Sequence, residues 1–166
     1  MQGYLIVWYH NPAMADRIEK NHRSRLMAKI RSKDTKPERW LRSVLHGKGY
    51  RFRLHNKRLP GSPDIVLAKY RAVIFVHGCF WHQHPHCKVA HIPKTRTEFW
   101  QNKFSRNERR DQHNLYQLKC LAWRTAVIWE CGLKKANRQH TLGHLLAWLH
   151  SGAEYLETPV YGLFDE

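Results

Sequence analysis

The segment from His77 to Cys87 constrains this chain more than any other stretch of its sequence. Its eleven residues, HGCFWHQHPHC, contain four histidines and two cysteines. Core packing does not require so many imidazoles and thiols together, whereas zinc prefers thiolate and imidazole ligands, four of them in a tetrahedron. The segment follows the short apolar run 71–76, which is typical of a buried central strand. It therefore predicts a metal-binding loop at the end of a strand.

A zinc site in this loop needs a fourth ligand from elsewhere in the chain. Cys79 and Cys87 supply two thiolates, and one of the histidines supplies a third ligand. Cys131 is the natural fourth, because it follows the apolar stretch 125–129, which we expect to lie beside the 71–76 strand. Four protein ligands leave no open coordination position, so this zinc is predicted to be structural. The alternative is a histidine-rich surface loop whose cysteines are incidental.

Asp64 stands in a second position that suits a metal. It ends the turn-forming stretch LPGSPD (59–64) and precedes the apolar residues 65–67, which predict a strand. A carboxylate between a loop and a strand can hold a hard cation such as Mg²⁺ against a phosphate group. Most Pro-Asp pairs only form turns, so this position by itself leaves both interpretations open.

The charge of the chain indicates a polyanionic partner. Its 29 lysines and arginines outnumber 13 acidic residues, which gives a formal net charge of +16. Each phosphate that a protein neutralises releases condensed counterions, so nucleic acid is the leading partner. An anionic membrane surface is the rival, but no long basic amphipathic helix supports it.

The sequence gives no signal for export or for insertion into a membrane. The stretch 1–13 has no basic start and no small-residue cleavage site, and no apolar run of about 18 residues occurs. We therefore expect a cytoplasmic protein whose cysteines bind metal rather than form disulfides.

The order of the predicted elements favours an α/β fold. Periodicity and turn signals predict a helix, three strands, a helix, a strand and a final helix, at 37–45, 50–54, 65–67, 71–76, 99–121, 125–129 and 141–150. The second helix is expected to be long, basic and mostly solvated, with Thr95 and Glu98 in a capping box at its start. These elements predict a small mixed sheet flanked by helices, in a single domain at 36–166. Residues 1–35 are expected to form a basic N-terminal arm, with 1–13 as a disordered extension.

Three aromatic residues accompany these polar groups. Phe80 and Trp81 interrupt the metal loop, and Trp100 lies near Lys103 and Arg106 on the long helix. Bulky apolar side chains beside basic ones can enter a base stack and open a duplex. The alternative is that they pack around the zinc site or against the core.

Taken in order, several motifs resemble those of one known family. They are RSKDTKPE at 31–38, LPGSPD at 59–64, VIFVHGCFWH at 73–82, KTRTEFW at 94–100 and VIWEC at 127–131. This series resembles the very short patch repair (Vsr) endonucleases over about two-thirds of the chain, from Arg23 to Cys131. The resemblance implies a restriction-endonuclease-like fold and Mg²⁺-dependent nicking of one DNA strand at a T:G mismatch. Such mismatches arise when 5-methylcytosine is deaminated beside a methyltransferase site.

The resemblance also implies roles for individual residues in the reaction. Asp64 matches the catalytic aspartate that binds Mg²⁺, and Val76 stands where the family contributes a main-chain carbonyl to the same ion. Glu38 matches an acidic residue that supports the site from the first helix. Three further matches are His82 as the general base, His77 as a second active-site histidine, and Asp111 as an acid that steadies His82.

The zinc and DNA contacts of the family can be carried over in the same way. Cys79, His84, Cys87 and Cys131 match the zinc ligands. Phe80, Trp81 and Trp100 match the aromatics that intercalate beside the mismatch, and Met27 matches a residue of the N-terminal arm that enters from the minor groove. The implied partners are double-stranded DNA with a T:G mismatch and mismatch-repair proteins; we expect a monomer with no membrane contact.

The sequence departs from the family pattern at three places. Seven residues separate Cys79 from Cys87 where the family usually has six, which makes His86 a rival to His84 as the zinc ligand. The wider nuclease superfamily carries an acidic-x-Lys pair where Phe75-Val76-His77 stands here, so a lysine-assisted mechanism does not apply. Residues 1–13 precede the start of the resemblance.

Two other functions remain as alternatives. A related restriction endonuclease would use the same scaffold to cut both strands of a short, fully paired site. A zinc-stabilised DNA-binding module would carry out no catalysis. It would therefore not need Asp64 and His82 in addition to the zinc ligands.

Overall fold

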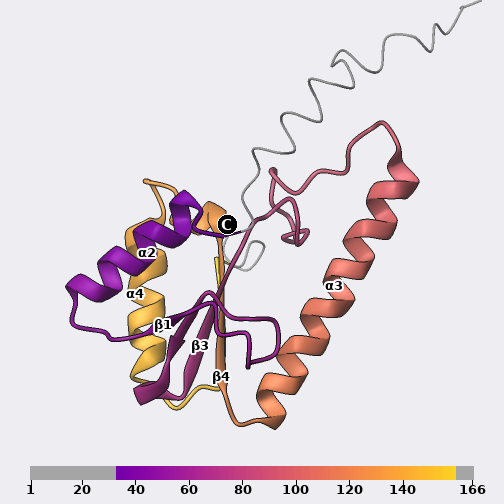
Figure 1. Cartoon of the computed structure of the whole chain (residues 1–166). Helices are drawn as coiled ribbons and strands as arrows, with labels where there is room; N and C mark the ends of the chain where they lie inside the picture. The colour runs from indigo at the N-terminus through magenta and orange to yellow at the C-terminus, as the bar shows by residue number, and fades with distance from the viewer. Residues whose placement is uncertain (1–32, 160–166) are drawn as a thin grey trace, which may run out of the picture.

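A five-stranded mixed sheet organises the residues that the computed structural model describes, 33–159 (Figure 1). Its strands stand in chain order: β1 (Arg53–Leu54), β2 (Ile65–Leu67), β3 (Ala72–His77), β4 (Arg124–Trp129) and β5 (Tyr155–Thr158). The first three strands pair antiparallel, and β3, β4 and β5 pair parallel. The predicted mixed α/β sheet is therefore confirmed.

Helices cover both faces of this sheet. Helices α2 (Lys36–Gly47) and α4 (Arg138–Leu149) lie on one face, and the long helix α3 (Thr97–Cys120) lies on the other (Figure 1). Two short 3-10 turns, Ala68–Tyr70 and Glu130–Leu133, follow β2 and β4. Within 33–159, no helix is long and apolar enough to cross a membrane.

The apolar run of β3 reflects burial on both of its faces. Ala72 and Ile74 pack in the main core with residues of α2 and α4, whereas Val73 and Phe75 pack with Leu118 of α3. A strand that is covered on both faces reads as a continuous apolar run rather than an alternating one. The expected burial of the 71–76 stretch as a central strand is confirmed.

Helix α2 begins with a capping box that the sequence analysis did not identify. The Thr35 hydroxyl accepts from the Glu38 N–H, while the Glu38 carboxylate accepts from the Thr35 N–H, with a proline in the first turn. This arrangement satisfies two of the N–H groups that a helix start leaves without partners. It also fixes Glu38 in place, only 3% exposed.

Helix α3 starts differently from the prediction. It begins at Thr97 after Arg96, which has a left-handed backbone with φ of 54°, and no side chain caps it. The Thr97 hydroxyl donates instead to the carbonyls of Pro93 and Lys94. The predicted capping box of Thr95 and Glu98 is therefore wrong, because Thr95 lies one residue before the cap position. The mostly solvated character of the helix is confirmed, with Phe104 and Leu118 as its buried residues.

The sheet differs from the prediction at both of its edges. The predicted strand 50–54 is reduced to the two residues of β1. Strand β5 was not predicted, since Tyr155 to Thr158 shows neither an apolar run nor a clear alternation, and it forms by parallel pairing with β4. Residues 1–32 and 160–166 lie outside the described residues, and so do Met27 and nearly all of the predicted basic arm.

The two threonine sites allow a matched test of the capping analysis. Thr35→Ala is expected to lower the free energy of unfolding by about 1 kcal/mol, because it removes the acceptor for the Glu38 N–H. Thr95→Ala is expected to change it by less than about 0.5 kcal/mol. Urea unfolding followed by circular dichroism measures both, and equal losses in the two variants would contradict the analysis.

Candidate active site

Every catalytic residue that the sequence analysis singled out lines one cavity of about 530 Å³. These are Glu38, Asp64, His77, His82 and Asp111, joined by Val76. They come from α2, from the start of β2, from the end of β3 and the loop after it, and from α3. The antiparallel pairing of β2 with β3 brings the start of one strand to the end of the other. Lys33 and Arg110 also line the cavity and add positive charge suited to a phosphate.

The loop before Asp64 fits closely against α3. Gly61 has φ of 71°, a backbone conformation that side chains disfavour. A Cβ atom at this position would lie 2.9 Å from Asn114 Nδ2 and 3.1 Å from Phe75 Cε1. The Gly in the LPGSPD motif therefore lets the loop pack against α3 and sets where Asp64 enters the cavity.

Asp64 is anchored to β3 through the main chain. Its Oδ2 accepts a hydrogen bond of 2.8 Å from the Val76 N–H. The N–H and C=O of one strand residue point to the same side of the strand, so the Val76 carbonyl points to the side of β3 on which Asp64 lies. Burial raises the pKa of Asp64 to about 6, and the charge of Glu38 adds to this, although the Val76 hydrogen bond acts in the opposite direction.

His82 and Asp111 form the tightest polar pair of the cavity. His82 Nδ1 lies 2.5 Å from Asp111 Oδ2. Burial works to raise the pKa of Asp111, but the hydrogen bond and charge of His82, with the charge of Arg110, lower it overall. An ionised carboxylate only accepts, so it holds the His82 proton on Nδ1 and leaves Nε2 as the acceptor atom.

The His77 ring stacks flat on the ring of His82. The two imidazole centroids are 3.9 Å apart, and the ring planes differ by 9°. Burial, helped by the charge of His82, lowers the pKa of His77 to about 3. His77 is therefore neutral at physiological pH, so it orients the ring of His82 without electrostatic repulsion.

Glu38 lines the cavity, but its oxygens are already engaged. Oε1 accepts from the hydroxyl and the N–H of Thr35, at 2.8 and 3.4 Å. Oε2 accepts from the Asp34 N–H at 3.0 Å and from Arg42 at 2.7 Å. A carboxylate offers about four acceptor positions, and these bonds use all of them. Glu38 thus supports the site by holding the start of α2 and Arg42.

The sequence analysis did not single out His55, a cavity residue beside Asp64. Its Nδ1 lies 3.6 Å from Asp64 Oδ1, and its backbone is left-handed with φ of 46°. A lone histidine after a short strand gives no distinguishing signal in the sequence. Only the antiparallel pairing of β1 with β2 brings the end of β1 beside Asp64.

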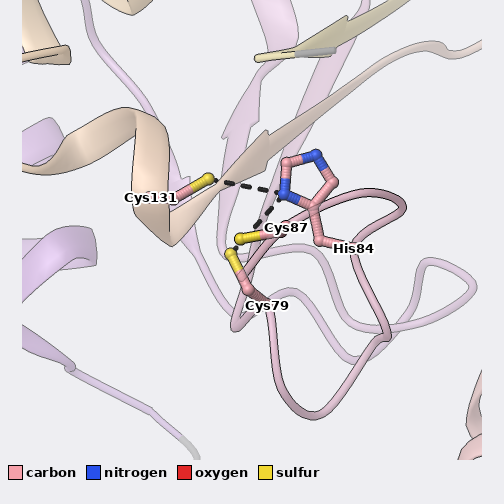
Figure 2. Close-up of side chains that lie close together, drawn as sticks. All are labelled: Cys79, His84, Cys87 and Cys131. Atoms are coloured by element: carbon pink, nitrogen blue, oxygen red, sulfur yellow. Dashed lines mark hydrogen bonds between the residues drawn. The ribbon is translucent and has the colours of Figure 1, made fainter. Parts of the chain in front are cut away.

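A second polar cluster lies at the ends of β3 and β4. Cys79, His84, Cys87 and Cys131 place their ligand atoms within 4.8 Å of one another (Figure 2). His84 Nδ1 is 3.4 Å from Cys131 Sγ and 3.7 Å from Cys79 Sγ. Strand pairing sets His77 opposite Trp129, so the residues two further along each chain, Cys79 and Cys131, meet. None of the four cysteines, all of them within 33–159, forms a disulfide.

The backbone determines which histidine faces these sulfur atoms. His84 is 2% exposed, and its Nε2 lies 2.9 Å from the Pro159 carbonyl. A carbonyl only accepts, so the proton is on Nε2 and Nδ1 presents a lone pair to the thiols. His86, by contrast, is exposed and has a left-handed backbone with φ of 57°. The structure brings His84, and not His86, into the cluster.

The three aromatic residues predicted to contact DNA form one group, with Phe80 and Trp81 in the 77–87 loop and Trp100 in α3. The Phe80 ring is 5.0 Å from Trp81, 5.4 Å from Trp100 and 5.2 Å from Phe104. Phe80, Trp81 and Trp100 are all half-buried, and the Lys103 ammonium lies 5.4 Å from the Trp81 ring. The 77–87 loop and α3 thus share an aromatic surface that borders basic side chains.

Comparison with known proteins places these features in a family. The model of the family described as DNA mismatch endonuclease Vsr matches residues 15–89. The chain is 50% identical over 120 residues to type II nicking enzyme V.XorIIP of Xanthomonas oryzae pv. oryzae, covering 72% of this chain and 88% of that protein. It is 47% identical over 121 residues to the DNA mismatch endonuclease Vsr of Escherichia coli, covering 73% and 77%. The chain belongs to the Vsr family.

Further relatives in this family carry similar names. Type II nicking enzyme V.NmeAIP of Neisseria meningitidis is 46% identical over 121 residues, covering 73% of this chain and 86% of that protein. As a Vsr family member, the chain is an endonuclease. The family resemblance inferred from the sequence motifs is confirmed.

The raised pKa of Asp64 predicts a stability change on neutralisation. The folded protein disfavours the ionised carboxylate, so the cost of folding grows as pH rises from 3.8 to about 6 and stays constant above that. Asp64→Asn is therefore expected to be more stable than the parent protein by up to about 3 kcal/mol near pH 8 in EDTA. Urea unfolding across pH measures the difference, which should shrink below about pH 6 and vanish near pH 4. A difference that is independent of pH would contradict this account.

Proposed function

We propose that this protein is a Mg²⁺-dependent DNA endonuclease that nicks one strand at T:G mismatches, and so starts very short patch repair after deamination of 5-methylcytosine. The observation that carries the proposal is the convergence of Asp64 and the His82–Asp111 pair on one cavity that Lys33 and Arg110 also line. Two relatives are named DNA mismatch endonuclease and nicking enzyme, which supports the reaction and the class of substrate.

The residues around Asp64 fit a hard cation. A carboxylate oxygen and a main-chain carbonyl are both ligands of the kind that Mg²⁺ prefers. Asp64 and Val76 would hold the ion. The Val76 N–H fixes the carboxylate on one side of β3, and the Val76 carbonyl points to that same side. A divalent cation would also stabilise the ionised form of Asp64, and so offset the effect of burial on its pKa. Bound there, Mg²⁺ would neutralise charge on the scissile phosphate and polarise it.

His82 would act as the general base. Asp111 holds the imidazole proton on Nδ1, which leaves Nε2 to take a proton from an attacking water. His77 stacks against the ring and limits its rotation. Lys33 and Arg110 supply positive charge near the phosphate, in a site where the strand has Phe75-Val76-His77 instead of an acidic-x-Lys pair.

The Cys79, His84, Cys87 and Cys131 cluster fits a structural Zn²⁺. In a tetrahedral site with zinc–sulfur bonds of about 2.3 Å and zinc–nitrogen bonds of about 2.1 Å, a nitrogen ligand and a sulfur ligand lie about 3.6 Å apart. The contacts of 3.4 and 3.7 Å around His84 Nδ1 match that spacing. Three thiols and an imidazole fill all four positions, so the ion would hold the loop that carries His82 and the aromatic residues rather than take part in catalysis.

The aromatic group supports the recognition of a mispaired base step. Phe80 and Trp81 of the 77–87 loop contact Trp100 in the first turn of α3, with Lys103 and Arg96 close to aromatic rings. Such side chains can enter the base stack where pairing is weakest, and the cost of unstacking is lowest at a mismatch. Met27 would approach from the minor groove, although it lies outside the described residues.

Cleavage of defined duplexes tests the proposal. With Mg²⁺, a duplex that carries one T:G mismatch is expected to be nicked in a single strand, whereas its fully paired counterpart and all samples in EDTA stay intact. Labelled oligonucleotides with each mismatch in varied flanks measure this on denaturing gels. Cleavage of both strands of paired DNA would show a restriction endonuclease instead. Binding without cleavage of any duplex would show a DNA-binding module.

Two histidines of the same loop give a matched pair for the catalytic role. His82→Ala is expected to slow nicking about 10²–10⁴-fold, because it removes the proton acceptor, while DNA affinity in EDTA stays unchanged. His86→Ala is expected to nick at the parent rate, since the side chain is exposed. Single-turnover rates and fluorescence anisotropy measure the two quantities. A rate for His82→Ala within threefold of the parent would rule out the general base.

Metal analysis tests the zinc assignment. The parent protein and His86→Ala are expected to hold one zinc per chain, whereas His84→Ala is expected to lose it. His84→Ala should also lose about 3 kcal/mol or more of stability, because the loop is no longer tied to β4. Atomic absorption and urea unfolding measure both effects. The reverse result, in which His86→Ala loses the metal, would assign the ligand to His86.

A further inference from the structure

Arg42 contacts three polar side chains, of which Glu38 and His55 line the active-site cavity. It donates to Asp34 Oδ1 and to Glu38 Oε2, and its Nη2 lies 2.9 Å from His55 Nε2. Asp34, Glu38 and His55 resemble a metal-binding group in composition and spacing. The guanidinium already occupies the position between them, so a second cation there would be repelled. The Arg42 side chain is only 10% exposed.

The contact with Arg42 decides which nitrogen of His55 carries the proton. A guanidinium only donates hydrogen bonds, so His55 Nε2 must accept and is unprotonated. Asp34 Oδ1 lies 3.6 Å from the same nitrogen, which is too far for a hydrogen bond, so the shorter Arg42 contact prevails. The ring proton of His55 is therefore on Nδ1.

The protonated nitrogen of His55 faces Asp64. Nδ1 is 3.6 Å from Asp64 Oδ1, while Asp64 Oδ2 accepts from the Val76 N–H. The two oxygens of the carboxylate are thus approached from two directions, by the main chain of β3 and by an imidazole N–H. The distance of 3.6 Å is longer than a hydrogen bond, but contacts in catalytic sites commonly tighten when the substrate binds.

We propose that His55, held by Arg42, is a positioning residue that orients the Asp64 carboxylate for its divalent cation. Glu38 fixes Arg42, Arg42 fixes the His55 tautomer, and His55 directs its N–H to Asp64. His55 acts through Asp64 and touches no reacting atom. This chain of contacts also lets Glu38 affect the reaction although its own oxygens are engaged. The proposal rests on the proposed function, because it assigns Asp64 to Mg²⁺.

Amide substitutions separate the two contacts of His55. In His55→Asn, the amide nitrogen can occupy the position of Nδ1 and donate to Asp64. In His55→Gln, the amide reaches the position of Nε2 and meets Arg42, but no donor remains at Nδ1. His55→Ala removes both contacts, and His46→Ala is the control, because His46 is exposed on the same helix as Arg42. Thermal unfolding reports the fold of each variant.

Metal binding is the primary measurement. Electron paramagnetic resonance follows the binding of Mn²⁺ to the protein without DNA, and the Mg²⁺ dependence of nicking is measured in parallel. His55→Ala and His55→Gln are expected to bind Mn²⁺ about 10–100-fold more weakly and to shift the half-maximal Mg²⁺ concentration by the same factor. The nicking rate at saturating Mg²⁺ and the DNA affinity in EDTA should stay near the parent values. His55→Asn and His46→Ala should remain within about threefold in every readout.

Two results would overturn the proposal. One is parent-like Mn²⁺ affinity in both His55→Ala and His55→Gln. The other is a loss in His55→Asn that equals or exceeds the loss in His55→Gln, which would show that only the Arg42 contact matters. If His55→Ala does not fold, the comparison of the two amide variants still decides. Failure of the proposed function looks different, since the parent protein would then bind Mn²⁺ no better than Asp64→Ala or would leave the T:G duplex intact.

Discussion

The pairing of β2, β3 and β4 is the constraint on which the rest of this molecule depends. Parallel pairing sets the end of β3 beside the end of β4, which joins Cys79 to Cys131. Antiparallel pairing sets the start of β2 at the same edge, which joins Asp64 to Val76. One edge of a small sheet therefore carries both the candidate active site and the candidate zinc site, as open α/β sheets commonly bind ligands beyond the carboxyl ends of their strands.

The site keeps several polar groups away from water, and hydrogen bonds or ring stacking hold them in place. Glu38 and Arg42 are buried together, His82 is paired with Asp111, and His77 is neutral because burial lowers its pKa to about 3. Buried polar groups that are held by such contacts move little, and a rigid site meets the transition state without reorganising. Asp64 differs, since its pKa of about 6 marks a carboxylate that a cation would stabilise.

Much of the fold and of the candidate site could be predicted from local sequence. The apolar run of β3 shows burial on both faces, and LPGSPD shows a turn that leads into a strand. The prediction fails where an element depends on distant partners. Strand β5 is defined by its parallel pairing with β4. Strand β1 extends only over the two residues that pair with β2. His55 and Arg42 gave no signal, because their roles arise from contacts across α2, β1 and β2.

The dense histidine and cysteine segment shows where sequence stops and tertiary structure begins. Its composition by itself determined that a metal-type cluster would stand at the end of β3, because few other environments combine those side chains. The sequence left His86 as a rival to His84 for the histidine position of this cluster. Tertiary structure decided between them, since Pro159, which follows β5, accepts from His84 and turns its other nitrogen toward the sulfur atoms. The backbone of His86 turns that side chain outward.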